Sequence, residues 1–402
     1  MANNNNKDKC NVPHLRFPEF SGEWKETTLG KIAEITKGSG ISKDQLSEQG
    51  SPCILYGELY TKYKSEIINE VYSRTELDSS PLVKSKANDV TIPCSGETAI
   101  DISTARCVLF NNILLGGDLN IIRLKYDDGG FFAYQLNGAR KKDIARVAQG
   151  VSVVHLYGEN LKQIRVYYPN IEEQRKITHL LSLIDGRIAT QNKIIEDLKK
   201  LKSAIIDYAI NSLDTDFAKF GSLYETAGEG GTPTTSNASF YDNGKIPFVK
   251  IDDLKQKYLT ENKDFITELG LQKSSAWLVP TRSILFSNGA TIGEITITTY
   301  PVCTKQGILG IVPKSNIDVE FLYYFMSSTY FKKAISRIVT EGTMKTAYLK
   351  DIANILCPIP TKEKQQGIAK MPSALNSKID YEQSLLKLFI MQKQYLLRQM
   401  FI

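Results

Sequence analysis

Apolar positions along residues 171–212 recur at a helical spacing over an unusual length. Ile177, Leu181 and Ile184 are separated by steps of 4 and 3 residues, with Lys and Glu around them. Positions at this spacing lie on one face of a helix, so the pattern predicts a helix with a narrow apolar stripe. The expected members of the stripe, of which the last two follow a skip of one residue, are Ile177, Leu181, Ile184, Ile188, Ile195, Leu198, Leu201 and Ile205. At 1.5 Å per residue, a helix of about 40 residues is roughly 60 Å long, and its stripe needs a partner helix.

A second helical pattern near the other end of the sequence can supply that partner. Its expected pairing positions are Leu375, Ile379, Leu386 and Phe389. Gly367 and Pro372 interrupt the beginning of this pattern, and proline in particular is expected to break or delay the helix. The alternative is that each helix packs only on the globular domain that precedes it.

The segments before the two helices have a different texture. Residues 25–165 contain short β-branched and aromatic runs, such as DVTIP at Asp89–Pro93, broken by Gly, Asn, Asp and Pro. This texture predicts a mostly β domain, with helix over residues 131–148. We expect a tail at 1–20 and domains at 21–169 and 213–360, followed by spacer helices at 170–212 and 361–402.

A long internal repeat relates these domains. In order, Leu29–Glu34 returns as Phe220–Glu225, Pro52–Leu59 as Pro247–Leu254, Ile92–Thr98 as Leu285–Thr291, Gly150 as Gly342, and Pro169 and Gln174 as Pro360 and Gln365. The offsets all lie between 191 and 195 residues. A period this long exceeds the roughly 20–50 residues of solenoid repeats, so each copy must be a complete domain plus its connector. The sequence is therefore a tandem duplication.

Composition adds little to this organisation. The net charge of +6 and pI near 8.7 mildly favour an anionic partner such as nucleic acid. The 6 cysteines form no CxxC pair and are expected to be reduced thiols, as in the cytoplasm. We expect neither a signal peptide nor a membrane-spanning segment.

Motifs for catalysis are missing from the sequence. Neither Gly38-Ser39-Gly40 nor Gly228-Glu229-Gly230-Gly231 continues into a phosphate-binding or dinucleotide-binding motif. His14, His155 and His179 are scattered and lack the neighbours of a metal site. We therefore expect no catalytic residue, no metal and no cofactor bound by this chain.

The order of domains and helices resembles the specificity subunit of type I restriction–modification enzymes. The segments that carry the resemblance are FPEFSGEWKETTLGKIAEI at 17–35, GGTPTTSNASFYDNGKIPFVKIDDL at 230–254, and the helix openings PNIEEQRKI at 169–177 and PTKEKQQGI at 360–368. A departure stands at Lys37–Gly40, where KGSG replaces the GTP loop of the family.

The resemblance implies an α+β fold with two duplicated, mostly-β target-recognition domains. Two long antiparallel helices, forming a coiled coil, separate the domains. Each domain is expected to read one half of an asymmetric, bipartite site in double-stranded DNA. The helices are expected to dock two methyltransferase subunits, and restriction–translocase subunits join the full cytoplasmic complex. S-adenosylmethionine, ATP and Mg²⁺ are expected on those partners.

Polar residues in the loops that repeat between the domains are the candidate DNA contacts. Short donors and acceptors on glycine-bearing loops suit phosphates and base edges, and a carboxylate can accept from a cytosine amino group. In the first domain these are Ser39, Tyr56, Glu58, Tyr60, Lys62, Ser95, Glu97, Thr98, Gln149 and Ser152. In the second they are Lys250, Asp252, Asp253, Ser287, Asn288, Thr291, Thr343, Lys345 and Thr346. The same side chains also suit ordinary turns.

Two other functions compete with DNA recognition by a non-catalytic subunit. A free-standing nuclease or methyltransferase needs a catalytic constellation that the sequence lacks. A coiled-coil scaffold that binds only proteins is a poor match to two large β domains. Copurification with methyltransferase subunits, followed by DNA binding of the complex, separates the three.

Overall fold

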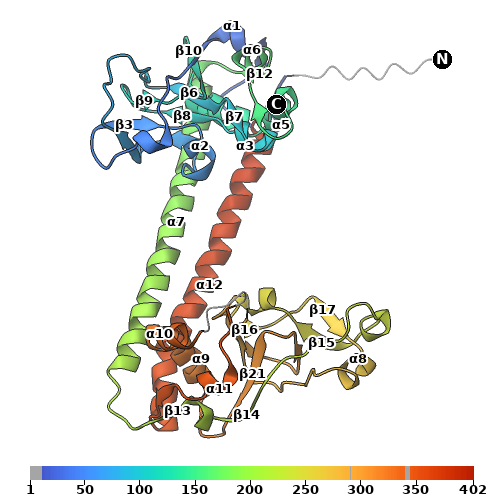
Figure 1. The fold of residues 1–402 in the computed structure, drawn as a ribbon. Helices are drawn as coiled ribbons and strands as arrows, with labels where there is room; N and C mark the ends of the chain where they lie inside the picture. Colours follow the sequence, from blue (N-terminus) through green and yellow to red (C-terminus); the bar gives the residue numbers. More distant parts are fainter. Residues whose placement is uncertain (1–10, 290, 340–344) are drawn as a thin grey trace, which may run out of the picture. The chain divides into compact units, whose positions relative to one another are not determined.

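The chain divides into two units that each combine one copy of the repeated domain with parts of both long helices (Figure 1). The first unit is Met1–Asn192 with Ser384–Ile402, and the second is Lys193–Gln383. The computed structural model describes residues 11–289, 291–339 and 345–402. Sheets, short helices and long helices occur in both units, which confirms the expected α+β class.

A five-stranded sheet in the order β2-β10-β6-β8-β4 forms the centre of the first domain. Its strands are β2 (Ala33–Lys37), β10 (Leu119–Leu124), β6 (Asp89–Pro93), β8 (Arg106–Val108) and β4 (Ile67–Ile68). All neighbours are antiparallel except β8 and β4. The run DVTIP is the central strand β6, and all of its residues are buried. Its polar residues are hydrogen-bonded inside the domain, since Asp89 accepts from Arg123 and the Thr91 hydroxyl donates to the Arg106 carbonyl.

Smaller sheets and short helices complete the first domain. The sheets join β5 (Ser73–Thr75), β3 (Ser51–Ile54) and β9 (Leu114–Leu115), then β1 (Lys25–Thr28) with β12 (Arg165–Tyr168), and β7 (Ser95–Gly96) with β11 (Val154–His155). The short helices are α1 (Leu29–Ile32), η1 (Lys43–Gln45), α2 (Glu58–Thr61), α3 (Ala99–Ile102) and α6 (Gly158–Lys162). The helical segment expected at 131–148 is two helices, α4 (Gly129–Asn137) and α5 (Lys141–Val147). Gly138 is the C-cap of α4, and its N–H still bonds back to the Tyr134 carbonyl at 2.9 Å.

The second domain repeats the five-stranded sheet and two of the smaller sheets of the first, while the β7–β11 pair has no counterpart among the residues that the structure describes. Its main sheet follows the order β14-β21-β18-β19-β16, again antiparallel except for the last pair. The strands are β14 (Tyr224–Glu229), β21 (Ile308–Pro313), β18 (Ile284–Ser287), β19 (Ile295–Thr298) and β16 (Tyr258–Leu259), with β17 (Asp264–Ile266), β15 (Ile246–Val249), β20 (Cys303–Thr304), β13 (Phe217–Lys219) and β22 (Leu356–Pro358) in the smaller sheets. Its helices are η2 (Phe220–Ser222), η3 (Ala238–Phe240), η4 (Ile251–Lys255), α8 (Glu268–Gln272), α9 (Val319–Ser327), α10 (Thr329–Ile338) and α11 (Leu349–Ile352). The matching pairings show that the duplication found in the sequence extends to the fold.

Segments of the two long helices lie antiparallel in each unit. These helices are α7 (Ile171–Asn211) and α12 (Lys362–Gln399). In the first unit, Ile177 and Leu181 of α7 share a core with Met400 and Phe401, just beyond α12. In the second, Ile206 and Ile210 of α7 share a core with Ala369 of α12. Each helix therefore packs both on a domain and beside the other helix.

The buried positions of α7 stay on one face along the helix, without the one-residue skip that the sequence pattern predicted. Leu201, expected in the stripe after a one-residue skip, is 48% exposed. Lys202 is partly buried and Ile206 is 4% exposed. At 3.6 residues per turn, positions 195, 202 and 206 lie on one face and 201 does not. The helix therefore places Lys202 on this face, where the sequence pattern predicted Leu201.

Pro372 does not break α12, contrary to the expectation for Gly367 and Pro372. The helix begins at Lys362 and continues through both residues. A proline inside a helix costs about 3 kcal/mol because it removes one hydrogen bond and crowds the preceding turn. Here Pro372 is itself buried, and Gln365 and Ala369 anchor the preceding turns in the second unit. Packing offsets the local penalty.

The P-x-x-x-x-Q signature that opens both helices has a structural role. Gln174 Nε2 donates to the Pro169 carbonyl at 2.9 Å, and its Oε1 accepts from the Asp128 N–H at 2.9 Å. Gln365 repeats the pattern with the Pro360 carbonyl at 2.8 Å and the Asp318 N–H at 2.8 Å. Asp128 and Asp318 cap α4 and α9. Each glutamine therefore joins the start of a long helix to the start of a domain helix.

A lysine from one long helix reaches the other in both units. In the first unit, Lys393 Nζ lies 2.6 Å from Asp185 and 2.5 Å from Glu66. In the second, Lys202 Nζ donates to Asn376 Oδ1 at 2.9 Å. Lys202 and Lys393 are 191 residues apart, as are Asp185 and Asn376. The duplication therefore preserves a polar cross-link, but the acceptor is charged in only one copy.

Candidate nucleic-acid interface

Two of the candidate loops meet in the first domain. Strands β7 and β11 pair Gly96 with Val154 and Ser95 with His155. His155 and Gln149 also exchange backbone hydrogen bonds at 2.9 and 2.7 Å. The loops at 95–98 and 149–155, which are far apart in the sequence, thus form one surface.

The segment around Tyr60 joins the same surface. The Tyr60 hydroxyl lies 3.7 Å from the point where a Cβ would stand at either Gly57 or Gly96. The pKa of Tyr60 is raised, mainly by burial and further by the neighbouring Tyr56, Asp101 and Glu97. Three of the matched segments therefore converge in the first domain, at residues 56–60, 95–101 and 149–155.

Glu58, one of the candidate DNA contacts, has its carboxylate hydrogen-bonded inside the domain. Its side chain accepts from the Leu55 N–H at 3.0 Å, from Lys62 Nζ at 2.6 Å and from the Ser73 hydroxyl. Only 6% of Glu58 is exposed. The carboxylate stabilises the turn into α2, and Lys62 is exposed beside it.

Some of the other candidates in the first domain form hydrogen bonds that hold the loops, and some are exposed. Ser39 Oγ accepts from the Val83 N–H at 2.8 Å, and Ser95 Oγ donates to Asp118 at 3.0 Å. Thr98 caps α3 by accepting from the Asp101 N–H at 3.1 Å. The exposed members are Lys62, Glu97, Thr98, Gln149 and Ser152.

In the second domain, the acidic segment after β15 is largely paired with nearby lysines. Asp253 accepts from the Lys250 N–H at 2.9 Å, which closes the start of η4. Lys250 Nζ pairs with Asp264 at 2.7 Å, and Asp252 pairs with Lys255 at 2.7 Å. The hydrogen bond from Lys255 lowers the pKa of Asp252. Helix η4 packs against β18 and β19, next to the loop that follows β18.

That loop, 287–294, is tied to residues 345–347. The Ala347 N–H donates to the Asn288 carbonyl at 2.9 Å, and Asn288 Nδ2 donates to the Ala347 carbonyl at 3.3 Å. Ser287 and Asn288 are almost fully buried, and Ser287 Oγ accepts from the Glu294 N–H at 2.8 Å. These two residues hold the loops together. Thr291 and Lys345 are exposed and Thr346 is half-buried, while Thr343 lies outside the described residues.

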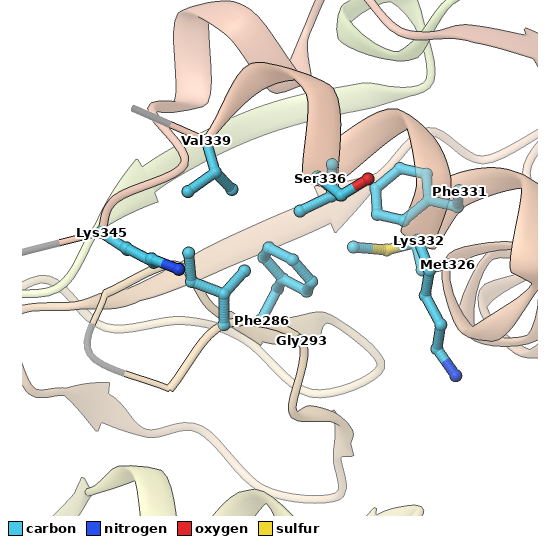
Figure 2. Close-up of a pocket in the computed structure, with 10 residues that line it drawn as sticks. Phe286, Gly293, Met326, Phe331, Lys332, Ser336, Val339 and Lys345 are labelled. Carbon is cyan, nitrogen blue, oxygen red and sulfur yellow. The ribbon is translucent and has the colours of Figure 1, made fainter. Parts of the chain in front are cut away.

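A cavity of about 350 Å³ lies beside this loop pair (Figure 2). Apolar side chains of β18, α9 and α10 line it, among them Phe286, Met326 and Phe331. Lys332 and Lys345 also belong to its lining, and neither forms an ion pair with a residue that the structure describes. In the first domain, the equivalent loop after β7 is longer and contains helix α3. Ile102 of this helix is fully buried against the domain core. The two candidate reading surfaces therefore differ in shape.

Sequence reasoning overlooked the apolar tip of the 149–155 loop. Val151 is 97% exposed and Val153 is 53% exposed, although Val154 is buried. The selection favoured polar side chains, so the valines between Gln149 and His155 were passed over. The available signal was a valine directly after Gly150, inside a repeated loop.

The described residues form neither a metal site nor a membrane-spanning helix. Within residues 11–289, 291–339 and 345–402, no group of three or more His, Cys, Asp or Glu side chains is placed to hold a metal ion. In the same ranges, no helix is both long and apolar enough to cross a membrane. The free cysteines that the structure describes are Cys53, Cys94, Cys107, Cys303 and Cys357, all buried.

The chain is similar over most of its length to type I restriction enzyme specificity subunits. It is 25% identical over 401 residues to the putative type I restriction enzyme MjaX specificity subunit of Methanocaldococcus jannaschii, covering 92% of this chain and 91% of that protein. It is 26% identical over 255 residues to the MjaIX specificity subunit of the same organism, covering 58% of this chain and 59% of that protein. The crystal structure of a type I restriction–modification S subunit from M. genitalium superposes with a TM-score of 0.62 at 18% identity, covering 97% of this chain and 99% of that one. At that identity the last match concerns the fold alone.

A family model described as the type I restriction modification DNA specificity domain matches residues 21–200 and again residues 214–388. The two matches contain the two copies of the domain and most of both long helices. The chain thus belongs to the family of type I restriction–modification DNA specificity proteins, and carries its domain twice.

Proposed function

We propose that this chain is the DNA-recognition subunit of a cytoplasmic type I restriction–modification complex and is not itself an enzyme. Each domain reads one half of an asymmetric, bipartite site in double-stranded DNA. Partner subunits carry S-adenosylmethionine, ATP and Mg²⁺ and perform methylation or cleavage. The observation that carries the proposal is that candidate loops distant in sequence converge in both copies of the domain.

The exposed ends of these surfaces have the chemistry that DNA requires. Lys62 in the first domain, and Lys332 and Lys345 in the second, suit phosphates. Glu97, Gln149 and the exposed hydroxyls offer donors and acceptors to base edges. Residues held by internal hydrogen bonds, such as Glu58 and Asn288, support the loops instead.

Two methyltransferase subunits dock on exposed apolar stripes of the long helices. In the first unit, Leu388, Met391 and Tyr395 of α12 are 60%, 54% and 58% exposed. In the second unit, Ile194, Leu201 and Tyr208 of α7 are 39%, 48% and 77% exposed. Steps of 3, 4 and 7 residues place each trio on one helix face. Exposed apolar stripes of this kind suit a protein partner, and each unit offers one.

Substitutions in the two stripes test this proposal by stoichiometry. The chain, coexpressed with its methyltransferase, should be isolated with two partner subunits and should methylate DNA at one bipartite sequence. Leu388→Glu with Met391→Glu should remove one partner, and Leu201→Glu with Tyr208→Glu the other, because a buried unpaired carboxylate is unfavourable. Native mass spectrometry counts the subunits, with Ile390→Glu as the control, because exposed Ile390 lies about 100° or more around α12 from both Leu388 and Met391. Retention of both partners in both variants would refute the docking surfaces, and methylation by the chain alone would refute the non-enzymatic role.

A further inference from the structure

The tip of the 149–155 loop presents an almost fully exposed apolar side chain. Val151 is 97% exposed, while its neighbours Gln149 and Ser152 are exposed polar residues. The tip is built rather than loose, because Gln149 and His155 close it with a pair of backbone hydrogen bonds. Gly150 has a φ of 120°, and a Cβ there would stand 2.1 Å from the Val153 carbonyl oxygen. Only glycine fits that position, so the turn fixes the direction in which the next residue points.

A valine so placed gains nothing from the protein itself. Burying a valine side chain is favourable, and Val151 forgoes that contribution. Pairing of β7 with β11 places the loop beside Glu97 and Thr98, within the candidate reading surface. In the major groove, the base edges display one apolar group, the C5 methyl of thymine.

We propose that Val151 contacts the C5 methyl of a thymine in the half-site read by the first domain. The contact makes thymine the preferred base at one position of that half-site. This inference rests on the proposed function, since it requires that the first domain read DNA. The second domain has Thr343 at the aligned place, after Gly342, so a valine contact belongs to the first half-site alone.

Deoxyuridine tests the contact, because it differs from thymidine only by the methyl group. Duplexes carry the methylated target with one thymine at a time replaced by deoxyuridine, in either half-site. The reconstituted complex with methyltransferase subunits binds them with S-adenosylmethionine present, and fluorescence anisotropy gives the Kd. One replacement in the first half-site should weaken binding by the unsubstituted protein about fourfold, as expected for one buried methyl group.

Val151→Ala should weaken binding to the intact target by a similar factor and should abolish the effect of that one replacement. Such non-additivity is the signature of a direct contact. The control Val153→Ala, two residues away and 53% exposed, should keep the full deoxyuridine effect. Replacements in the second half-site should affect the unsubstituted protein and Val151→Ala equally.

Several outcomes overturn the inference and leave the proposed function standing. They are a first half-site with no thymine on either strand, no effect of any replacement there, and equal effects with and without Val151. A complex that assembles but shows no sequence-specific binding overturns both the inference and the proposed function.

Discussion

At the scale of single residues, Gln174 and Gln365 show how one side chain orders several segments. Each amide accepts from the N–H of a helix-capping aspartate and donates to the carbonyl of a proline five residues earlier. Both glutamines are almost fully buried. Buried polar groups that lose their partners are unfavourable, so the signature residue supports the fold rather than any reaction.

Gln365→Ala should destabilise the second unit by about 1–3 kcal/mol, the usual cost of leaving buried backbone groups unpaired. The chain has 2 tryptophans, Trp24 in the first unit and Trp277 in the second. Urea denaturation of the Trp24→Phe background, followed by Trp277 fluorescence, isolates the second unit. Gln366→Ala changes the neighbouring, exposed glutamine and should leave the midpoint within about 0.5 kcal/mol. Equal effects of the two substitutions would contradict a stabilising role for the hydrogen bonds of Gln365.

Residue roles at the candidate interface were only partly predictable from sequence. Repetition correctly drew attention to loops that the fold brings together. It could not show that Glu58 and Asn288 face inward, because the same polar side chains serve turns and DNA contacts. Selection by polarity also passed over Val151, whose exposure depends on the pairing of β7 with β11.

At the scale of elements, the cross-links of the long helices differ in charge between the units. Lys393 pairs with two carboxylates, of which Glu66 is 7% and Asp185 is 9% exposed. Lys202 meets the neutral Asn376 instead, and burial lowers the pKa of Lys202. A polar residue in an apolar helix interface typically fixes the register of the pair.

Lys393→Ala should destabilise the first unit by about 3–5 kcal/mol, because it leaves two buried carboxylates unpaired. Lys202→Ala, at the equivalent position of the other copy, should cost the second unit less, about 1.5–3 kcal/mol, as for one hydrogen bond from a charged donor to a neutral acceptor. Urea denaturation measures the first with Trp24 in a Trp277→Phe background and the second with Trp277 in a Trp24→Phe background. If both substitutions had the same effect, charge would not be what distinguishes the two cross-links.

The long helices were predictable because their apolar stripe extends over many turns. Two local features were less so. Lys202 is a polar residue within the apolar stripe, but it lies on the same helix face as the residues before and after it. Around Pro372, the packing of neighbouring residues outweighs the local penalty of proline. Both depend on contacts with segments remote in sequence.

At the scale of the whole molecule, the duplicated domains have separate cores. Phe286 and Phe325 belong to the second core, and Trp24 and Phe131 to the first. The tandem repeat predicted this division, since its offsets vary by only four residues over the chain. The details of each reading surface differ, as α3 in the first domain and the cavity in the second show.

Replacing residues 213–360 by the matching domain of a relative should therefore change one half of the DNA target and preserve the other. The reason is that each domain has its own hydrophobic core and its own pair of converged loops. Methylation mapping of cells that carry the exchanged subunit and the native methyltransferase reports both halves. A simultaneous change in both halves would mean that the domains do not read independently.

The burial of Met400 and Phe401 in the first core has a consequence during protein synthesis. Trp24 contacts the Phe401 ring, and the Leu15 N–H bonds to the Gln399 carbonyl at 2.8 Å. The ribosome must therefore translate the whole second unit before it supplies the residues that close the first. The second unit is the first to have all its residues available, so the order of completion reverses the order of the two domains along the messenger RNA.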